Sequence, residues 1–311
     1  MGWRKALRDS ADAFQLQISE AIAASGASSV ILCSSMTNAQ TIKNDFPEIP
    51  VVLFMHENQL GYPGSELPNK FAQINWQSLS AADLAIFNSK FHLNQLPELL
   101  PKIGVEPAQI QELTTKSVVG YVGIDPELFE LSTRQGEAPL ILFNQRWEED
   151  KRPDVFLEAC VQLKSMGYEF ELALCGEHYP GRYQVPDLLR ERIKFEGCLP
   201  RETYKQVLAE TDIVVSTSVH EYFGVAVAEA IAAGAIPCLP NRLSYPELLP
   251  ESAIELLYDD NFAAKLRDLL DTLEVTRIDY QELLRAHLHQ FKWEKVALGY
   301  DNTFSSLAVS T

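Results

Sequence analysis

The pattern that most constrains the fold of this chain occurs twice along it: short β-branched apolar runs alternate with longer helical stretches. This alternation is typical of parallel sheets flanked by helices. In the first half the runs predict strands at Val30–Cys33, Val51–Met55, Leu84–Asn88 and Val118–Val122. In the second half they predict strands at Pro139–Phe143, Phe170–Cys175, Ile193–Glu196, Ile213–Ser216 and Ile236–Leu239. We therefore expect an α/β protein built from two parallel-sheet domains.

The expected domain boundaries follow from length and from one polar segment. A chain of 311 residues is too long for one ordinary core and suits two α/β domains. The polar, glycine-containing stretch 131–138 predicts a linker between a domain over 1–130 and a domain over 139–290. Residues 291–311 are expected to form a helix that returns to the first domain. The chain begins with a polar helical segment instead of the strand and glycine-rich turn that open a nucleotide-binding fold, so we expect the first domain to lack its initial strand.

Composition argues against several classes of protein. The net charge is −17, with −6 over residues 1–138 and −11 over residues 139–311, which argues against broad nucleic-acid binding through long-range attraction. No stretch approaches the roughly 18 apolar residues of a membrane span, and the N-terminal segment has no apolar signal core. The cysteines have no zinc-site spacing and predict reduced core residues of a cytoplasmic protein: Cys33, Cys160, Cys175, Cys198 and Cys238.

A candidate ligand-binding loop follows the predicted strand Ile213–Ser216. Ligands of parallel α/β sheets bind off the carboxyl ends of the strands, so the polar residues after this strand are expected to face a crevice. A helix is predicted to begin near Gly224, and its N-terminus offers free backbone N–H groups and a positive dipole end that suit a pyrophosphate. Gly224 also lets the backbone approach a ligand closely.

Two glutamates belong to this loop and helix. Glu221 lies before the helix, and Glu229 lies about a turn and a half inside it. One carboxylate can accept hydrogen bonds from two hydroxyls, so Glu229 suits a ribose diol and Glu221 suits a sugar nearer the phosphates. The alternatives are that Glu229 is a surface residue of the helix and Glu221 a neighbour of its N-cap. The buried strand before them and Gly234 after them favour the binding function.

Two cations follow the first predicted strand of the second half. Arg146 and Lys151 stand where fixed positive charges can neutralise a diphosphate leaving group without a metal ion. Nothing around them resembles the Asp-x-Asp motif of metal-dependent transferases. The alternative is that both cations are solvated beside the acidic run Glu148–Asp150.

Together, Arg146-x4-Lys151 and Glu221-Tyr-Phe-Gly-x4-Glu229 resemble the retaining GT-B glycosyltransferases of family four, over about residues 139–250. The resemblance implies two Rossmann-like domains facing across a cleft and metal-independent transfer of a hexose from a sugar nucleotide. It implies that Arg146 and Lys151 contact the donor phosphates, that Glu229 holds the ribose and that Glu221 contacts the transferred sugar. It also implies backbone donors at Phe223, Gly224 and Val225.

A second candidate loop follows the strand Val51–Met55 and begins at His56. A lone histidine at a strand end is more often structural, but polar neighbours crowd this loop and favour a function in binding an acceptor: Glu57, Asn58, Gln59 and Tyr62. Asn88 ends another predicted strand. It suits either acceptor binding or, together with Ser89, the cap of the next helix, and both readings remain open.

Five segments resemble a narrower group, the tRNA-queuosine mannosyltransferases, and they lie at 54–63, 87–91, 144–151, 216–224 and 240–247. The resemblance implies transfer of mannose from GDP-mannose, with retention, to the cyclopentenediol of queuosine in tRNA-Asp. It implies that His56 lies near the transferred sugar, and that the partners are a sugar nucleotide and tRNA without a cofactor, metal or membrane. Two alternatives remain open: transfer of another sugar to a small molecule, lipid or polysaccharide, and a catalytically silent protein that binds a nucleotide sugar.

Overall fold

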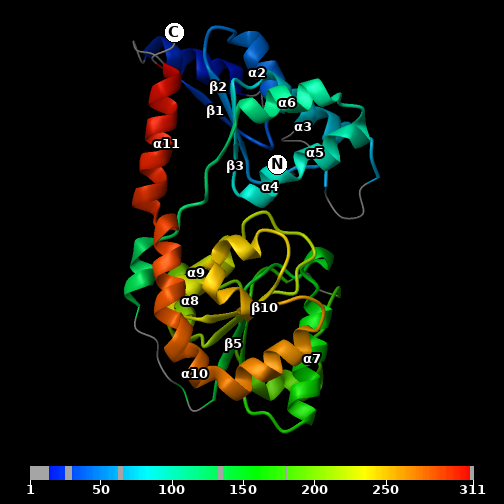
Figure 1. Cartoon of the computed structure of the whole chain (residues 1–311), viewed down its shortest axis with the longest axis vertical. Coiled ribbons are helices and arrows are strands. Elements are labelled where there is room, and N and C mark those ends of the chain that lie inside the picture. Colours follow the sequence, from blue (N-terminus) through cyan, green and yellow to red (C-terminus); the bar gives the residue numbers. More distant parts are fainter. Residues whose placement is uncertain are drawn as a thin grey trace. The chain divides into compact units, whose positions relative to one another are not determined.

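The computed structural model describes residues 14–24, 30–61, 66–131, 136, 138–178 and 181–308. Contacts divide the chain into two units (Figure 1): unit 1 is Met1–Tyr121 with Val296–Thr311, and unit 2 is Val122–Lys295. Each unit has its own parallel sheet with its own helices, which confirms the predicted α/β class. Each predicted strand is present with small shifts at its ends.

Unit 1 is built on a sheet in the order β1-β2-β3-β4, in which all neighbouring strands are parallel. The strands are β1 Ile31–Ser34, β2 Val51–Met55, β3 Leu84–Phe87 and β4 Ser117–Val119. The helical elements are residues 14–24, α2 Ala39–Asp45, α3 Lys70–Ala81, α4 Lys90–Asn94, α5 Leu96–Leu99, η1 Leu100–Ile103 and α6 Pro107–Thr115. Met55 lies opposite Phe87 in the register, and both are fully buried. The loops that follow β2 and β3 therefore begin side by side at one edge of the sheet.

Unit 2 contains a six-stranded sheet in the order β10-β9-β8-β5-β6-β7, again parallel at each pair. The strands are β5 Leu140–Phe143, β6 Glu171–Cys175, β7 Ile193–Gly197, β8 Ile213–Val215, β9 Ile236–Pro240 and β10 Leu257–Tyr258. The chain order runs one way from β5 to β7 and the other way from β8 to β10. The direction therefore reverses between β5 and β8, and such a reversal is where open parallel sheets bind ligands.

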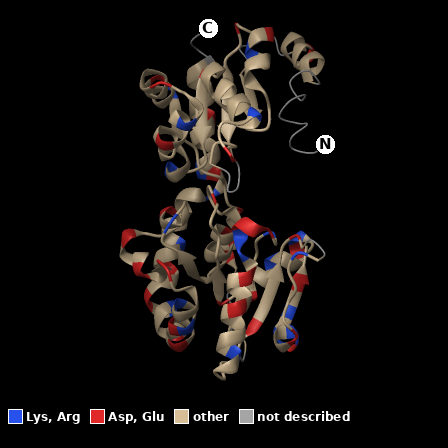
Figure 2. Ribbon diagram, turned by 90° about the vertical axis from the view of Figure 1, so that its right-hand side faces the viewer, with Lys and Arg blue, Asp and Glu red and all other residues tan. Residues whose placement is uncertain are grey.

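The helices of unit 2 surround this sheet (Figure 1). They are α7 Pro153–Ser165, α8 Arg201–Glu210, α9 Val225–Ala233 and α10 Phe262–Leu288, with short 3-10 turns η2 Pro126–Glu130, η3 Glu149–Lys151, η4 Asp187–Arg192, η5 Tyr245–Leu248, η6 Glu251–Leu256 and η7 His289–Phe291. β5, β8 and β9 are buried at every position, as expected of central parallel strands. Acidic and basic residues are interspersed along the ribbons of both units (Figure 2).

The last helix, α11 Trp293–Ala308, leaves unit 2 and belongs to unit 1 from Val296 onward. The hydroxyl of its Tyr300 donates to the carbonyl oxygens of Gly120 and Tyr121, each at 2.9 Å. A Cβ atom at Gly120 would lie 2.9 Å from the Tyr300 ring, so this close approach requires glycine. Residues 122–131 associate with unit 2, where Ile124 forms a parallel bridge with Lys292.

Some predictions concern residues that the structure does not describe. Residues 1–13 are among them, so the expectation that the first domain lacks its initial strand stays a prediction. Of the predicted linker 131–138, residues 132–135 and 137 are also outside the described part. The prediction that all cysteines are core residues is wrong at one position: four are buried, but Cys198 is exposed in the turn after β7. The thiols of all five are free.

Candidate functional site

Two loops of unit 2 meet where the strand order reverses. The first follows β5 and runs from Asn144 through η3 to Lys151, and the second follows β8 and runs from Ser216 to Gly224. β5 and β8 are paired neighbours, so their carboxyl ends place both loops over the same edge of the sheet. The residues predicted to bind the donor phosphates and sugar are thus brought together by the topology.

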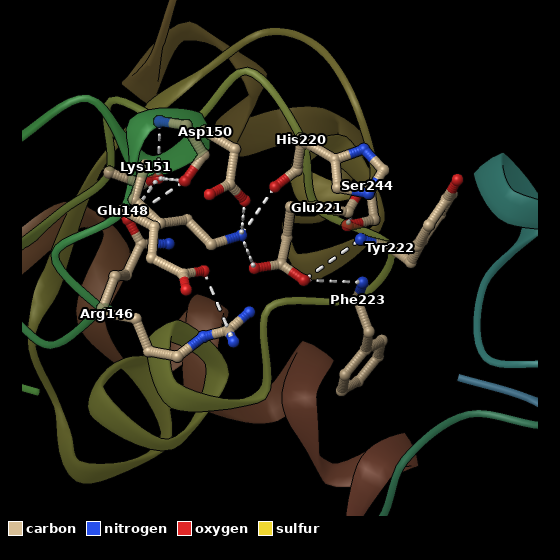
Figure 3. Close-up of polar contacts among 12 residues, drawn as sticks. Arg146, Glu148, Asp150, Lys151, His220, Glu221, Tyr222, Phe223 and Ser244 are labelled. Carbon is tan, nitrogen blue, oxygen red and sulfur yellow. Dashed lines mark hydrogen bonds and ion pairs between the residues drawn. The ribbon is translucent and has the colours of Figure 1, made fainter. Parts of the chain in front are cut away.

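Lys151 lies between the two loops in a buried set of acceptors (Figure 3). Its ammonium donates to the carbonyl oxygen of His220 at 2.6 Å and lies 3.2 Å from Asp150 Oδ2 and 3.3 Å from Glu221 Oε2. Burial by itself lowers the pKa of Lys151, but the carboxylates of Glu221 and Asp150 outweigh it and raise the pKa above its ordinary value. The Lys151 side chain is only 10% exposed, so the alternative of a solvated cation is excluded for this residue.

Arg146 differs from Lys151 in exposure. Its side chain is 53% exposed, and its Nη1 lies 3.4 Å from Glu148 Oε2. This placement beside the acidic run matches the alternative of a solvated cation. The site therefore contains one cation fixed by burial and one accessible cation, and both come from the loop after β5.

Glu221 closes the second loop onto itself. One oxygen of its carboxylate accepts from the backbone N–H of Tyr222 at 3.0 Å and of Phe223 at 3.4 Å, while the other faces Lys151 (Figure 3). The alternative, in which Glu221 neighbours the helix cap, therefore describes this conformation. The same carboxylate is the partner of the buried ammonium, so it is also part of the candidate site.

Helix α9 begins directly after the loop. Gly224 is its N-cap residue with φ of 87°, in the left-handed region that favours glycine. No side chain caps the helix, and the first N–H groups of a helix have no intrahelical partner. Val225 is 41% exposed at this end, whereas the Phe223 ring packs edge-on against Phe291. The arrangement can bind an anion at the helix start, as the sequence predicts.

Replacing Gly224 with alanine is expected to lower the free energy of unfolding by about 1–2 kcal/mol from backbone strain alone. A further loss comes from the Cβ atom, which would lie 3.2 Å from a ring carbon of the fully buried Tyr245. Gly167→Ala is the matched control, since its φ is +90° and nothing lies within 4 Å of its Cβ position. Denaturant unfolding should show a larger loss for Gly224→Ala, and equal losses would contradict the steric part.

Glu229 lies on α9 with its side chain 16% exposed, so it is not an ordinary surface residue. Its Oε1 accepts from Arg201 Nη1 at 2.9 Å, and Arg201 Nη2 also binds Asp125 Oδ2 at 3.1 Å. Burial raises the pKa of Glu229, and the Arg201 guanidinium partly offsets this rise. The carboxylate predicted to hold a ribose is therefore paired with a guanidinium in this structure.

A ring of buried hydrogen bonds lies beneath the site, and sequence reasoning did not assign it. Gln145 Nε2 donates to Tyr245 Oη at 2.9 Å, Tyr245 Oη lies 2.6 Å from Ser216 Oγ, and Ser216 Oγ donates to Gln145 Oε1 at 3.1 Å. These residues follow β5, β8 and β9, which are adjacent in the sheet. The ring therefore ties together the loops that carry Lys151 and Glu221. The sequence signal that could have indicated this ring is that its three polar residues all lie at or after the ends of predicted strands.

His220 makes the stability of this loop depend on pH. Burial, reinforced by the Lys151 ammonium, lowers the pKa of His220 to about 4. The unfolded chain then binds more protons than the folded chain between pH of about 6.5 and 4, so stability is fully present above this window and is lost as pH falls through it, by about 3 kcal/mol in total. The difference in unfolding free energy between wild type and His220→Gln, measured from pH 7 to 4, should change by this amount. A constant difference would contradict the assignment.

The predicted acceptor loop lies in unit 1 after β2. His56 is exposed, and Ser35 Oγ lies 3.1 Å from its Nδ1 atom. Asn58 and Asn88 are buried, and both of their side-chain amides hydrogen-bond to other residues of unit 1. Glu57 is half-buried, Gln59 is buried, and Tyr62 lies outside the described residues.

Ser89 caps helix α4 by accepting from the His92 N–H at 3.0 Å, so the capping alternative holds for Ser89. The Asn88 side chain instead contacts the His56 carbonyl oxygen and the His92 ring. The acceptor-binding roles of Glu57, Asn58, Gln59, Tyr62 and Asn88 stay predictions.

The described part of the chain has neither a cluster of metal ligands nor a membrane-spanning helix. No group of three or more His, Cys, Asp or Glu side chains in it is placed to hold a metal ion. Within the same residues, no helix is long and apolar enough to cross a membrane.

Comparison with known proteins identifies the chain as a glycosyltransferase. Residues 125–284 match the family described as glycosyl transferases group 1, and residues 1–124 match the N-terminal family of tRNA-queuosine alpha-mannosyltransferases. A tRNA-queuosine alpha-mannosyltransferase of Drosophila melanogaster is 32% identical over 260 residues, which are 76% of this chain and 67% of that protein. The chain thus belongs to the tRNA-queuosine alpha-mannosyltransferase family.

Solved structures share the fold at low sequence identity. Sucrose-phosphate synthase from Thermosynechococcus elongatus superimposes with a TM-score of 0.71 and 17% identity, covering 96% of this chain and 78% of that one. A glycosyltransferase from Rickettsia africae superimposes with a TM-score of 0.70 and 17% identity, covering 97% of this chain and 81% of that one. Anabaena HepE in complex with UDP and glucose superimposes with a TM-score of 0.67 and 20% identity, covering 88% of this chain and 78% of that one. The GT-B expectation from the sequence is therefore confirmed.

Proposed function

We propose that this chain transfers mannose from GDP-mannose, with retention and without a metal ion, to queuosine in tRNA-Asp. The observation that carries the proposal is the match of residues 1–124 to the N-terminal family of tRNA-queuosine alpha-mannosyltransferases, because this segment contains the predicted acceptor loop at His56. The donor side rests on the loops at the β5/β8 reversal. A tRNA substrate would place the reaction in the cytoplasm.

To bind a donor phosphate, Lys151 must exchange one of its present hydrogen-bond acceptors for a phosphate oxygen. An ammonium has three N–H donors, and those of Lys151 already face His220 O, Asp150 and Glu221. Of the two carboxylates, Glu221 is the more exposed, at 21% against 7%, so it is the partner that would turn to the transferred sugar while Lys151 contacts a phosphate. Arg146 would bind the same diphosphate from the solvent side.

The nucleoside side of the donor would need a second exchange. Glu229 would release Arg201 and accept the two ribose hydroxyls, since a carboxylate can accept from both at once. Backbone N–H groups of Phe223, Gly224 and Val225 would bind the diphosphate at the start of α9. HepE, which shares the fold, was also solved in complex with UDP-glucose, so a sugar nucleotide fits this class of structure.

In the proposed step, a queuosine hydroxyl oxygen forms a bond to C1 of mannose while the bond from C1 to the phosphate oxygen breaks. GDP departs with that electron pair, and the hydroxyl proton passes to the departing phosphate on the same face. Lys151, Arg146 and the helix start would stabilise the charge that develops on the phosphate, which is usually the largest catalytic term. His56 would lie near the transferred sugar.

Incubating the protein with bulk tRNA and either GDP-mannose or UDP-glucose tests the proposal. Digestion to nucleosides and mass spectrometry should show a hexose added to queuosine with GDP-mannose only. The matched control is tRNA from cells that lack queuosine, which should gain no hexose. Transfer from UDP-glucose would overturn the assignment of the donor. Nucleotide binding without any transfer would instead support a silent binding protein.

A further inference from the structure

His92 lies in α4, near the acceptor loop but outside it, and no role has been assigned to it. Its side chain is fully buried, and its ring packs edge-on against Phe87 at 5.1 Å between centroids. Its two ring nitrogens each face an asparagine: Nδ1 lies 2.8 Å from Asn88 Oδ1, and Nε2 lies 2.8 Å from Asn58 Nδ2. An imidazole buried between two amides must satisfy both with one proton arrangement.

Backbone partners fix that arrangement. Asn88 Nδ2 donates to the carbonyl oxygen of His56 at 2.9 Å, so the Asn88 oxygen is the atom turned toward His92 and Nδ1 must carry the proton. Asn58 Oδ1 accepts from the N–H groups of Leu60 at 2.9 Å and Gly61 at 3.0 Å, so the Asn58 NH2 group faces His92 and Nε2 must accept. The imidazole is therefore neutral, in the Nδ1–H tautomer.

This chain of hydrogen bonds reaches the acceptor loop at its first residue and again at residues 60 and 61. Asn88 binds the carbonyl oxygen of residue 56, and Asn58 binds the amides of residues 60 and 61. A third anchor lies between them, where Asn75 Oδ1 accepts from the Gln59 N–H at 2.7 Å. The exposed side chain of His56 thus projects from a loop whose backbone is anchored at residues 56, 59, 60 and 61.

We propose that His92 is a positioning residue of the transfer reaction: through Asn88 and Asn58 it fixes the loop that presents His56 to the acceptor and the transferred sugar. This inference rests on the proposed function for its catalytic consequence. Its structural part does not, because the tautomer and the loop anchoring follow from unit 1 alone. His92 itself is too deeply buried to touch a substrate.

His92→Leu and His92→Gln test the proposal as a pair. Leucine leaves the Asn58 NH2 group and the Asn88 oxygen without partners, whereas the glutamine amide offers one donor and one acceptor. We expect His92→Leu to lower kcat for mannosyl transfer by about 10- to 100-fold, the loss typical of a displaced reacting group. The Kd for GDP, a ligand of unit 2, should be unchanged. His92→Gln should recover most of the rate.

A matched control separates positioning from general destabilisation. Asp83→Asn weakens another polar anchor of unit 1, where Asp83 Oδ2 accepts from the Val51 N–H at 2.7 Å and binds Lys43 at 2.9 Å. Val51 begins β2, so this anchor lies at the opposite end of the strand from the loop. At a temperature where both variants are folded, Asp83→Asn should keep the wild-type kcat. Equal loss of kcat in the two variants, or a normal kcat in His92→Leu, would overturn the positioning role.

The anchoring by His92 can also be tested without an activity assay. If the wild-type protein fails to modify queuosine, only the proposed function is overturned, and the following measurements still test the anchoring. Nitrogen-15 spectra of the imidazoles should show His92 with a proton on Nδ1 and a lone pair on Nε2. The Leu60 and Gly61 amides should exchange slowly in wild type and quickly in His92→Leu. The opposite tautomer, or exchange that does not change in the variant, would overturn the anchoring.

Discussion

Replacing Lys151 with alanine is expected to lower turnover by about 10²-fold or more, because a fixed cation that stabilises the departing diphosphate has an effect of that size. The structure adds a second consequence. Lys151 is the shared partner of two carboxylates, Asp150 and Glu221, with exposed fractions of 7% and 21%. Removing the ammonium leaves them facing each other uncompensated, so the free energy of unfolding should also fall by about 3–5 kcal/mol.

Two measurements separate these effects for Lys151→Ala. Turnover should be measured at a temperature where thermal melting shows the variant folded, and the Kd of guanosine should be compared with that of GDP. Only GDP should lose affinity, because guanosine has no phosphate. Lys194→Ala is the control: this lysine pairs with Glu171 and Glu210 at the edge of the same sheet, and its turnover should match wild type. Near-normal turnover of Lys151→Ala would contradict the role of Lys151.

Replacing Glu229 with alanine is expected to raise the Kd of GDP by about 10- to 100-fold, because a hydrogen bond to a charged group contributes about 1.5–3 kcal/mol. The loss of affinity is reduced by one effect: Arg201 binds Glu229 in this structure, so wild type must break this pair before Glu229 can bind the ribose. Glu229→Gln keeps the size of the side chain and should lose less affinity than alanine.

The ribose assignment of Glu229 has its own test. Isothermal titration with GDP and with a GDP analogue that lacks the ribose hydroxyls should show that Glu229→Ala weakens only the first. GDP and UDP should lose the same factor, because both contain ribose. A loss that differs between the two bases would instead place the guanine or uracil ring against Glu229.

Much of the fold could be predicted from local pattern. Val51–Met55 is a strand over the residues expected, and the strands of unit 2 follow from apolar runs between turns. The short β10 was not expected, because two residues are too few to form a pattern. The meeting of the two candidate donor loops could be predicted, since each follows a buried strand and parallel strands place such loops at one edge of a sheet.

The states of the site residues could not be predicted in the same way. Lys151 and Arg146 stand in one short loop, yet one is buried and the other exposed, because the acceptors around Lys151 include residues about seventy positions later in the chain. Arg201 contacts Glu229 across 28 positions of the chain, and Tyr245 contacts Gln145 across 100. Such pairings depend on the packed sheet, which no local spacing encodes. The same holds for His92 in α4, whose partner Asn58 lies 34 positions earlier in the chain.

Helix α11 has a consequence for dissecting the protein into parts. The boundary between the two matched families falls at residues 124 and 125, but unit 1 is completed by residues from Val296 onward. A fragment ending at residue 124 would uncover the carbonyl oxygens of Gly120 and Tyr121 and the face of Phe54 that Tyr300 packs against. Expression of unit 1 by itself should therefore join residues 296–308 to its end through a flexible linker.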